Sequence, residues 1–449
     1  MNPRLTLASS VVGTAIVALD GTVLTVAQPT LQRDLSASFA EVQWTTTGYL
    51  IAVASLLVFA GRLGDRYGHH RVFGIGMLGF GAASAGIALA PGVGWVIGLR
   101  VVQGVFGALS QPATLGMLRA AFPPDRLRRP IAVRTAAIGV AAAAGPVLGG
   151  ALVAGPGWRA VFLLNVVPAL VLGALALAVR PSRRSSPSVL DMPGALLLAV
   201  TLACLVHALA AQPGRGWTAA TAVVTGAAFV RHERRTASPL LPSDVMGSAA
   251  VTSALGMLVV ASAALSGTLF VGTFVLQGGF GLDPLRSALV SLPLALLMVL
   301  AAPSCAVLLR RAGARRTSGA AMAVLALGIL ALSHAAGFPA LCVGFALVGA
   351  GFGTVMVAAT HVVVREAAVE SAGVAGGLQQ TAMNLGPVLG VAAAAALMGA
   401  GGRPELPLGV LAVLALAGAA LGRALPGRAD VTIDDHDQSE DRTPVPARR

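Results

Sequence analysis

The sequence predicts an all-helical protein that crosses a membrane many times. Of its 449 residues, 56% are hydrophobic and only 11% are charged, and soluble globular domains do not sustain that ratio over this length. Apolar segments of roughly 20 residues, long enough to cross a bilayer as a helix, recur from end to end. The net charge of +13 comes from Arg alone, without Lys. Because the arginines cluster at every second loop, they indicate cytoplasmic loops and argue against a nucleic-acid-binding surface.

Windows of roughly 20 apolar residues predict fourteen transmembrane helices. They lie near residues 8–28, 42–61, 72–90, 95–118, 131–154, 160–179, 190–210, 217–230, 249–276, 287–309, 317–336, 338–364, 373–399 and 407–425. Segment 217–230 is short for an untilted crossing, so a re-entrant segment is the alternative there. The first apolar segment has no cleavage-site pattern, and we expect it to remain as a span.

The arginine pattern predicts that both termini are cytoplasmic, because basic residues resist translocation. With the N-terminus inside, the Arg clusters fall in cytoplasmic loops and each opposite loop holds at most one Arg. If only one of the segments 190–210 and 217–230 crossed, every later cluster would lie on the wrong side. We therefore expect both to cross. The Ala-, Gly- and Arg-rich composition is typical of a bacterial genome, so we expect a multi-pass protein of the bacterial cytoplasmic membrane.

Two internal repeats predict two related bundles. Gly-Pro-Val-Leu-Gly occurs at 145–149 and again at 386–390, and Arg-Tyr-Gly-His-His-Arg at 66–71 is echoed by Arg-Ala-Gly-Ala-Arg-Arg at 311–316. The two offsets, 241 and 245 residues, are longer than one six-helix unit by about two helices. In membrane proteins built from two such repeats, the transport path lies where the repeats meet. The prediction is a six-helix bundle over 1–188, an inserted helix pair and cytoplasmic loop over 189–248, a second six-helix bundle over 249–425 and a disordered cytoplasmic tail over 426–449.

The polar segment 61–71 predicts a conformational latch between two spans. Its glycines allow a sharp turn and close helix ends, and its charged residues can form charge-assisted bonds that exist in one access state and break in the other. The residues assigned to this latch are Gly61, Gly64, Asp65, Arg66, Gly68 and Arg71.

The segment 145–150 predicts a bent helix in close contact with a neighbour. Pro146 frees a backbone carbonyl and bends the helix. Gly145, Gly149 and Gly150 allow another helix to approach.

Asp20 and Arg100 are the charged residues that we expect deep in the membrane. A charge at the bilayer centre costs roughly 2.5–3.5 kcal/mol on insertion scales, so such residues usually face a cavity and serve function. Desolvation favours protonated Asp20, which makes it a candidate proton carrier. Asp20 is the obvious partner for Arg100, and pairing would allow substrate or a helix shift to release the proton. The alternatives are a packing role for Asp20 and snorkelling of Arg100 to the interface.

Other polar residues within the spans are candidates to line a cavity, although interhelical hydrogen bonding explains each equally well. They are Gln103, Gln111, Gln277, Gln380 and Asn384. The cysteines Cys204, Cys305 and Cys342 lie in apolar segments and are expected to be buried structural residues. No nucleotide-binding loop, metal-ligand spacing or nucleophilic triad is evident. We therefore expect no enzyme, no metal and no cofactor, with a proton gradient as the energy source.

Three motifs together resemble the major facilitator superfamily, and in particular its fourteen-span drug:proton antiporters. They are residues 19–29, the segment 61–71, and 145–150 followed by Trp158, Arg159, Phe162, Asn165 and Pro168. The resemblance implies that Asp20 serves coupling or substrate recognition, that Asp65 holds the outward-open state and that 145–150 marks an antiporter. His69 and His70 stand where that family usually carries Arg or Lys.

The resemblance and the residues together predict proton-coupled efflux of small amphipathic molecules such as drugs or antibiotics. We expect the partners to be the substrate, protons and the lipid bilayer, without nucleic acid, and the functional unit to be a monomer. Proton-symport uptake on the same scaffold is one alternative, and a non-transporting receptor or scaffold is another. The sequence does not specify the substrate.

Overall fold

A computed structural model describes residues 3–123, 126–178, 191–209, 215–236, 239, 248–366, 372–399 and 403–425. Throughout these ranges the secondary structure is helical, with turns and short connections between the helices. The predicted tail 426–449, the arginines at 180, 183 and 184, and most of the 212–216 loop lie outside the described residues.

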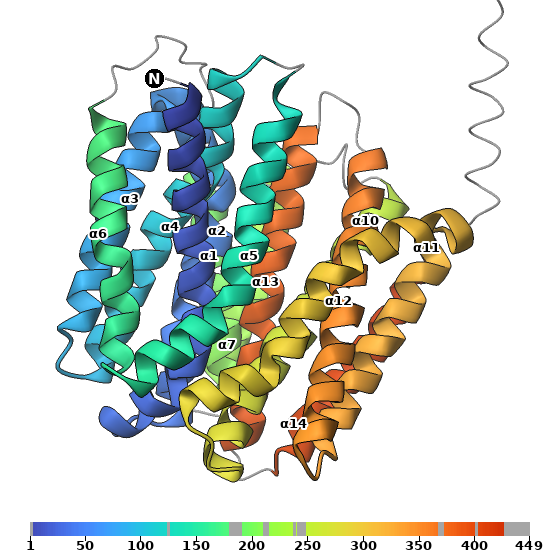
Figure 1. Cartoon of the computed structure of the whole chain (residues 1–449). Helices are drawn as coiled ribbons and strands as arrows, with labels where there is room; N and C mark the ends of the chain where they lie inside the picture. The colour runs from blue at the N-terminus through green and yellow to red at the C-terminus, as the bar shows by residue number, and fades with distance from the viewer. Residues whose placement is uncertain are drawn as a thin grey trace, which may run out of the picture.

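The helices run in chain order through two bundles (Figure 1). The first contains α1 (Pro3–Asp34), α2 (Phe39–Tyr67), α3 (His69–Ala88), α4 (Val93–Ala121), α5 (Arg128–Ala154) and α6 (Trp158–Leu177). Next come α7 (Met192–Leu209) and α8 (Arg215–Glu233). The second bundle contains α10 (Ala249–Phe274) with the π-helical turn η2 (Val275–Gly279), α11 (Pro284–Ser333), α12 (Phe338–Glu366), α13 (Ala372–Gly399), α14 (Glu405–Leu421) and the 3-10 turn η4 (Gly422–Ala424).

Local signals explain where several helices begin. Before α2, the Ser38 hydroxyl accepts a hydrogen bond from the Glu41 amide while the Glu41 carboxylate accepts one from the Ser38 amide, a reciprocal cap of two free helix-end donors. Asp283 caps α11 in a similar way, and Pro284 follows at the first helical position, where its missing N–H costs nothing.

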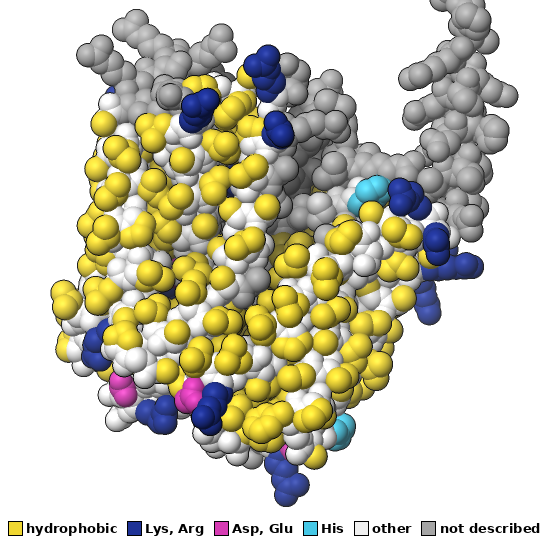
Figure 2. All heavy atoms as spheres, viewed as in Figure 1, with side chains coloured by type: hydrophobic (Ala, Val, Ile, Leu, Met, Phe, Trp, Pro, Cys, Tyr) yellow, Lys and Arg dark blue, Asp and Glu magenta, His cyan; other side chains and the backbone are white. Residues whose placement is uncertain are grey.

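By length and composition, the described part of the chain contains 11 helices able to cross a membrane, or up to 12 if the bent α5 counts as one span. The helix α7 is apolar but shorter, and α8 is not among them. Each of the fourteen predicted segments overlaps a helix of the described residues. Only 11 or 12 of these segments are long and apolar enough to count as spans, so the structure does not show fourteen. Figure 2 shows hydrophobic side chains covering the sides of the bundles, with most of the visible Arg side chains near the two ends.

The 50-residue helix α11 contains a turn at Gly313, whose φ is 74°. Gly68, between α2 and α3, has φ 95°. Both backbones lie in the region that favours glycine, and the two residues are 245 positions apart, which is the offset of the 66–71 and 311–316 repeat. The first part of α11 therefore corresponds to α2 and the second part to α3.

Glycine contacts show the same correspondence inside the bundles. On α5, Gly149 lies against Val23 of α1, and on α13, Gly390 lies against Ala263 of α10. Gly104 of α4 lies against the Tyr49 carbonyl of α2, and Gly349 lies against the Leu294 carbonyl. Since a side chain at any of these glycines would meet the facing helix, each bundle holds its helices at backbone distance.

The α5 helix bends by 41° between 129–142 and 144–154. Pro146 explains the position of the bend, because its ring clashes with the carbonyl of the residue four positions earlier, Ala142. Below the bend, Gly145 faces Thr22 of α1, while Gly150 faces Pro284 and Leu285 at the start of α11. The predicted motif 145–150 therefore packs α5 against its own bundle and against the second one.

The two bundles make further contacts at the end of the molecule opposite the N-terminus (Figure 1). The Gln277 amide donates to the Val26 carbonyl at 2.9 Å. The rings of Phe39 and Phe274 lie edge to face with centroids 5.0 Å apart. Elsewhere, α2 packs on α13, and α5 packs on α11. These two contacts are equivalent in the repeat. The first part of α11 is the counterpart of α2, and α13 is the counterpart of α5.

The helices α7 and α8 form an antiparallel hairpin beside the first bundle. Thr201 and Thr225 share a 2.9 Å hydrogen bond, and the Asp191 carboxylate before α7 lies 2.7 Å from His232 near the end of α8. One face of α7 packs with α2 and α13 through Leu202 and Val206. Beyond α8, the Pro239 carbonyl accepts a hydrogen bond from Arg62, so this end of the hairpin lies beside the 61–71 segment.

Gly390→Ala should destabilise the protein, because the new methyl group would meet the Ala263 carbonyl on α10. Overpacking of this kind typically costs about 1–3 kcal/mol, so the thermal midpoint of the detergent-purified protein should fall. Gly399→Ala on the same helix is the matched control, because nothing lies within 4 Å of its added carbon. If both variants melted together, the close contact between α10 and α13 would not contribute to stability.

Candidate functional site

Asp20 lies at the centre of a buried polar network in the first bundle. Its carboxylate accepts hydrogen bonds from Arg100 Nη1 at 2.6 Å, Asn165 Nδ2 at 2.8 Å and Gln103 Nε2 at 3.2 Å. These donors come from α4 and α6, while Asp20 belongs to α1. Its side chain is 1% exposed. The arrangement satisfies an ionised carboxylate, which is an acceptor only.

Arg100 is equally enclosed, with 1% exposure. Its Nε donates to the Thr45 carbonyl at 2.9 Å, and its Nη1 also donates to Gln103 Oε1 at 2.6 Å. The guanidinium lies over the Tyr49 ring, 4.3 Å from the centroid, and 5.9 Å from that of Phe162. These contacts hold the cation in the bundle interior. Arg100 therefore pairs with Asp20 and does not snorkel to the interface.

Gln103 connects the pair to a further helix. It follows Arg100 by three residues, which puts both side chains on one face of α4. Its Nε2 donates to the Ser84 hydroxyl at 2.8 Å, and Ser84 donates to the Phe80 carbonyl at 2.9 Å on α3. Gln103 is fully buried. It belongs to the charge network, and its bonds to Asp20 of α1 and Ser84 of α3 are the interhelical hydrogen bonds that the sequence analysis gave as the alternative to lining a cavity.

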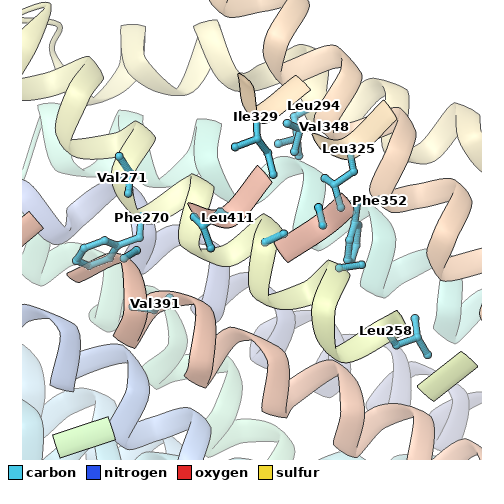
Figure 3. Packing of buried hydrophobic residues seen from close by; sticks show 14 of the residues in the cluster. Leu258, Phe270, Val271, Leu294, Leu325, Ile329, Val348, Phe352, Val391 and Leu411 are labelled. Carbon is cyan, nitrogen blue, oxygen red and sulfur yellow. The ribbon is translucent and has the colours of Figure 1, made fainter. Parts of the chain in front are cut away.

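The second bundle has an apolar core at the equivalent positions. The glycine contacts recur in the second bundle after 240 residues for α1 and after 245 residues for α4. These offsets make Val260 the equivalent of Asp20, Phe345 that of Arg100 and Val348 that of Gln103. Phe345 is 2% exposed and Val348 is fully buried. Figure 3 shows Val348 among Leu294, Leu325 and Ile329. The charge pair is therefore a feature of one bundle, and the repeat does not duplicate it.

The 61–71 segment turns between α2 and α3 with its residues mostly near the surface. Asp65 lies 3.2 Å from His69, and both side chains are partly exposed. The His69 ring occupies the space beside Gly64 of α2 and Gly116 of α4, where any added side chain would collide with it. His69 thus fills a position built from two glycines, which is the reason that Gly64 is needed here.

The other predicted cavity residues come from three different parts of the chain, namely α4, η2 and α13. Gln277 contacts α1 through Val26, as described above. The Gln111 side chain is partly buried, Gln380 is exposed, and Asn384, one turn further along α13, has a buried Nδ2 without a hydrogen-bond partner among the described residues. Cys305 is buried and Cys204 and Cys342 are partly buried, all as free thiols.

Comparison with known protein families identifies the family to which the chain belongs. A model of the Major Facilitator Superfamily matches residues 11–311 and 256–447. The chain belongs to this superfamily. It is a membrane transporter family and not a family of enzymes.

Several curated relatives are named as drug or antibiotic efflux proteins. The chain is 40% identical over 409 residues to the tetracenomycin C resistance and export protein of Streptomyces glaucescens, covering 88% of this chain and 76% of that protein. It is 32% identical over 390 residues to the multidrug efflux pump LfrA of Mycolicibacterium smegmatis, covering 84% and 77%.

Solved structures support the fold alone. A bacterial homolog of the human lysosomal transporter Spinster, in an inward-facing and unoccupied conformation, superposes with TM-score 0.66 at 16% identity and covers 99% of both chains. A peptide transporter bound to alafosfalin gives TM-score 0.67, also at 16% identity, over 94% of this chain and 96% of that one.

Sequence reasoning did not foresee the contacts of Asn165 and Tyr49 in the Asp20 network, and it did not single out Arg134 elsewhere in the first bundle. Asn165 was noted within a motif, but nothing in its spacing showed that it donates to Asp20 from α6. Tyr49 was not singled out, because an aromatic residue in an apolar segment looks like packing. Arg134 lies inside the predicted span 131–154 and was the one visible signal that was passed over, beside the cluster at 126, 128 and 129.

Arg100→Gln should destabilise the protein more than Asp20→Asn does. Asp20→Asn leaves Arg100 its bonds to the Thr45 carbonyl and Gln103 and its contact with the Tyr49 ring, whereas Arg100→Gln removes the cation together with these contacts. Breaking a buried pair typically costs about 3–5 kcal/mol. The double variant should recover part of that loss, since two neutral amides can share hydrogen bonds. Thermal midpoints of the four purified proteins give the coupling. Additive losses in the double variant would contradict a direct charge interaction.

Proposed function

We propose that this transporter exports small amphipathic drugs or antibiotics in exchange for protons. One observation carries the proposal: an ionisable carboxylate, Asp20, is buried among α1, α4 and α6, with a permanent cation as its partner. Intramembrane ionisable residues mark proton relays and substrate paths. The names of two relatives at 40% and 32% identity, an antibiotic resistance and export protein and a multidrug efflux pump, support the direction of transport.

The geometry supports a specific proton step. When a proton reaches Asp20, the carboxyl loses its charge and no longer needs the guanidinium. Arg100 has other partners in reach, namely the Thr45 carbonyl, Gln103 Oε1 and the Tyr49 ring. Protonation of Asp20 and opening of the 2.6 Å contact are therefore linked, and each favours the other. In the reverse direction, the pair re-forms as the proton leaves.

The proposed orientation puts both termini in the cytoplasm. The interbundle contacts of Gly150, Gln277 and Phe39 then lie at the outer end, and the conformation is closed to the outside. Asp65, at the cytoplasmic end, pairs with His69 of its own bundle. This supports a latch that engages the second bundle only after the cytoplasmic side closes, with Arg66 and Arg71 beside Asp65 as charges for that contact.

We further propose fourteen spans, with α7 and α8 crossing as a hairpin. Their 18 and 19 residues rise about 27–28 Å, close to the roughly 30 Å of a hydrocarbon core. Thr201 bonds to Thr225 midway, while Asp191 and His232 pair at one end. These contacts and the packing of α7 on α2 support a pair that follows the first bundle across the membrane.

The proton gradient supplies adequate energy for this exchange. An inward proton releases about 2.3 kcal/mol per 100 mV of membrane potential and about 1.4 kcal/mol per unit of pH difference. Conformational equilibria between access states are biased by a few kcal/mol, so one proton is enough to shift them.

Asp20→Asn should abolish proton-driven export while the protein still folds, because the amide keeps the shape and cannot exchange a proton. Everted vesicles energised by respiration would be screened with dyes and antibiotics, following both accumulation and substrate-induced release of the pH gradient. Asp34→Asn is the control, since it makes the same change at the end of α1, where Asp34 accepts from Trp158. Undiminished accumulation by Asp20→Asn would assign coupling elsewhere, and wild-type uptake in the opposite direction would indicate a symporter.

A cysteine in place of Gly216 should label from outside the cell, and one in place of Arg235 only from the cytoplasm. Both positions are exposed and lie at opposite ends of α8. The experiment uses a background in which the three native cysteines are replaced and a thiol reagent that does not cross the membrane. Labelling of both positions from the same side would exclude a crossing by α8 and the fourteen-span arrangement.

A further inference from the structure

A second polar cluster lies in the first bundle, centred on Arg134 of α5. Its Nε donates to the Thr114 hydroxyl at 2.9 Å, and its Nη2 donates to the Gln111 carbonyl at 3.4 Å, both on α4. From α1, Ser10 donates to the Thr114 carbonyl at 3.2 Å, and the Thr14 hydroxyl lies 3.4 Å from that of Thr114. Three helices thus meet around one guanidinium.

This cluster is separate from the Asp20 network. Ser10 precedes Asp20 by ten residues on α1, which is about 15 Å of helix rise. Arg134 lies six residues after the first residue of α5, and Thr114 lies seven residues before the last residue of α4, about 9–10 Å from those helix ends. The cluster therefore lies between the Asp20 network and the end of the bundle that carries the N-terminus.

Among the described residues, Arg134 has no counter-ion. Its bonds go to a hydroxyl and a carbonyl, and no carboxylate of the described residues forms an ion pair with it. Arg100, in the same bundle, shows the contrasting arrangement, with a carboxylate at 2.6 Å. A guanidinium offers five N–H donors, and Nη1 of Arg134 has no partner among the described residues. The side chain is only partly buried, so a ligand can reach it.

We propose that Arg134 binds the acidic group of an amphipathic organic anion, such as a carboxylate or ionised phenol on an aromatic frame. The proposal rests on the proposed export function and names its substrate class. A fork of N–H donors suits a planar anion, and an unpaired cation inside a span discriminates against a cationic ligand. The Thr114 hydroxyl and Gln111 carbonyl hold the guanidinium in place while Nη1 remains available.

Binding to the purified full-length transporter tests this directly. The probes are fluorescein, which carries a carboxylate and a phenolate, and ethidium, an aromatic cation, each followed by fluorescence anisotropy. Arg134→Gln should raise the Kd for fluorescein about ten-fold or more, as expected for loss of a charge-assisted contact, and leave the Kd for ethidium unchanged or lower. Arg134→Lys should fall between the wild type and Arg134→Gln.

Arg129→Gln is the matched control, because it removes the same charge from an exposed position on the same helix and should leave both affinities unchanged. Equal weakening of both probes by Arg134→Gln, or tight ethidium binding without fluorescein binding by the wild type, would overturn the anion assignment. The readout is binding and needs no proton gradient. A failure of coupled export in vesicles is therefore a separate result from a failure of anion recognition.

Discussion

The contact between Asp20 and Arg100 is the interaction on which the first bundle depends. Each charge needs polar partners in this interior, because an unpaired buried ion costs several kcal/mol. Together they require a carbonyl from α2 that accepts from the Arg100 guanidinium, and an amide from α6 and a glutamine from α4 that donate to the carboxylate of α1. The network therefore sets the relative positions of four helices. In the proposed mechanism, a change in the charge of the carboxylate acts on these four helices together.

The close glycine contacts explain how such a unit can move as a whole. In both bundles, glycines bring helix backbones into contact at registers repeated after 240–245 residues, as with Gly149 and Gly390. Packed interiors are poorly compressible, so motion is directed to the interface between bundles. There the contacts are fewer and involve ends of helices, such as Gly150 against Pro284 and Gln277 against Val26. Rigid-body rocking is the motion this arrangement favours.

The helices and the repeat could be predicted because they depend on local composition and on spacing within the chain. The positive φ of Gly68 and Gly313 was implied by one repeated motif. The partners of Asp20 could be guessed only in part. Arg100 follows from charge balance, whereas Asn165 and Tyr49 depend on helix rotation, which apolar segments with little amphipathic pattern do not specify. For the same reason the sequence left two roles open for Gln103, a cavity residue or an interhelical hydrogen-bonding residue, and the structure shows its hydrogen bonds to Asp20 and Ser84.

The asymmetry between the bundles constrains the proposed mechanism. A proton shifts the balance between access states only if it binds one state more tightly than the other, so the surroundings of Asp20 need to differ between them. The second bundle has Val260, Phe345 and Val348 at the equivalent positions and supplies no second carboxylate there. In the proposed mechanism, the effect of protonating Asp20 therefore has to reach the second bundle through helices of the first bundle that contact it. Helix α1 carries Asp20 and also contacts α5, α10 and α11, which makes it the element whose displacement links the charge pair to the interface.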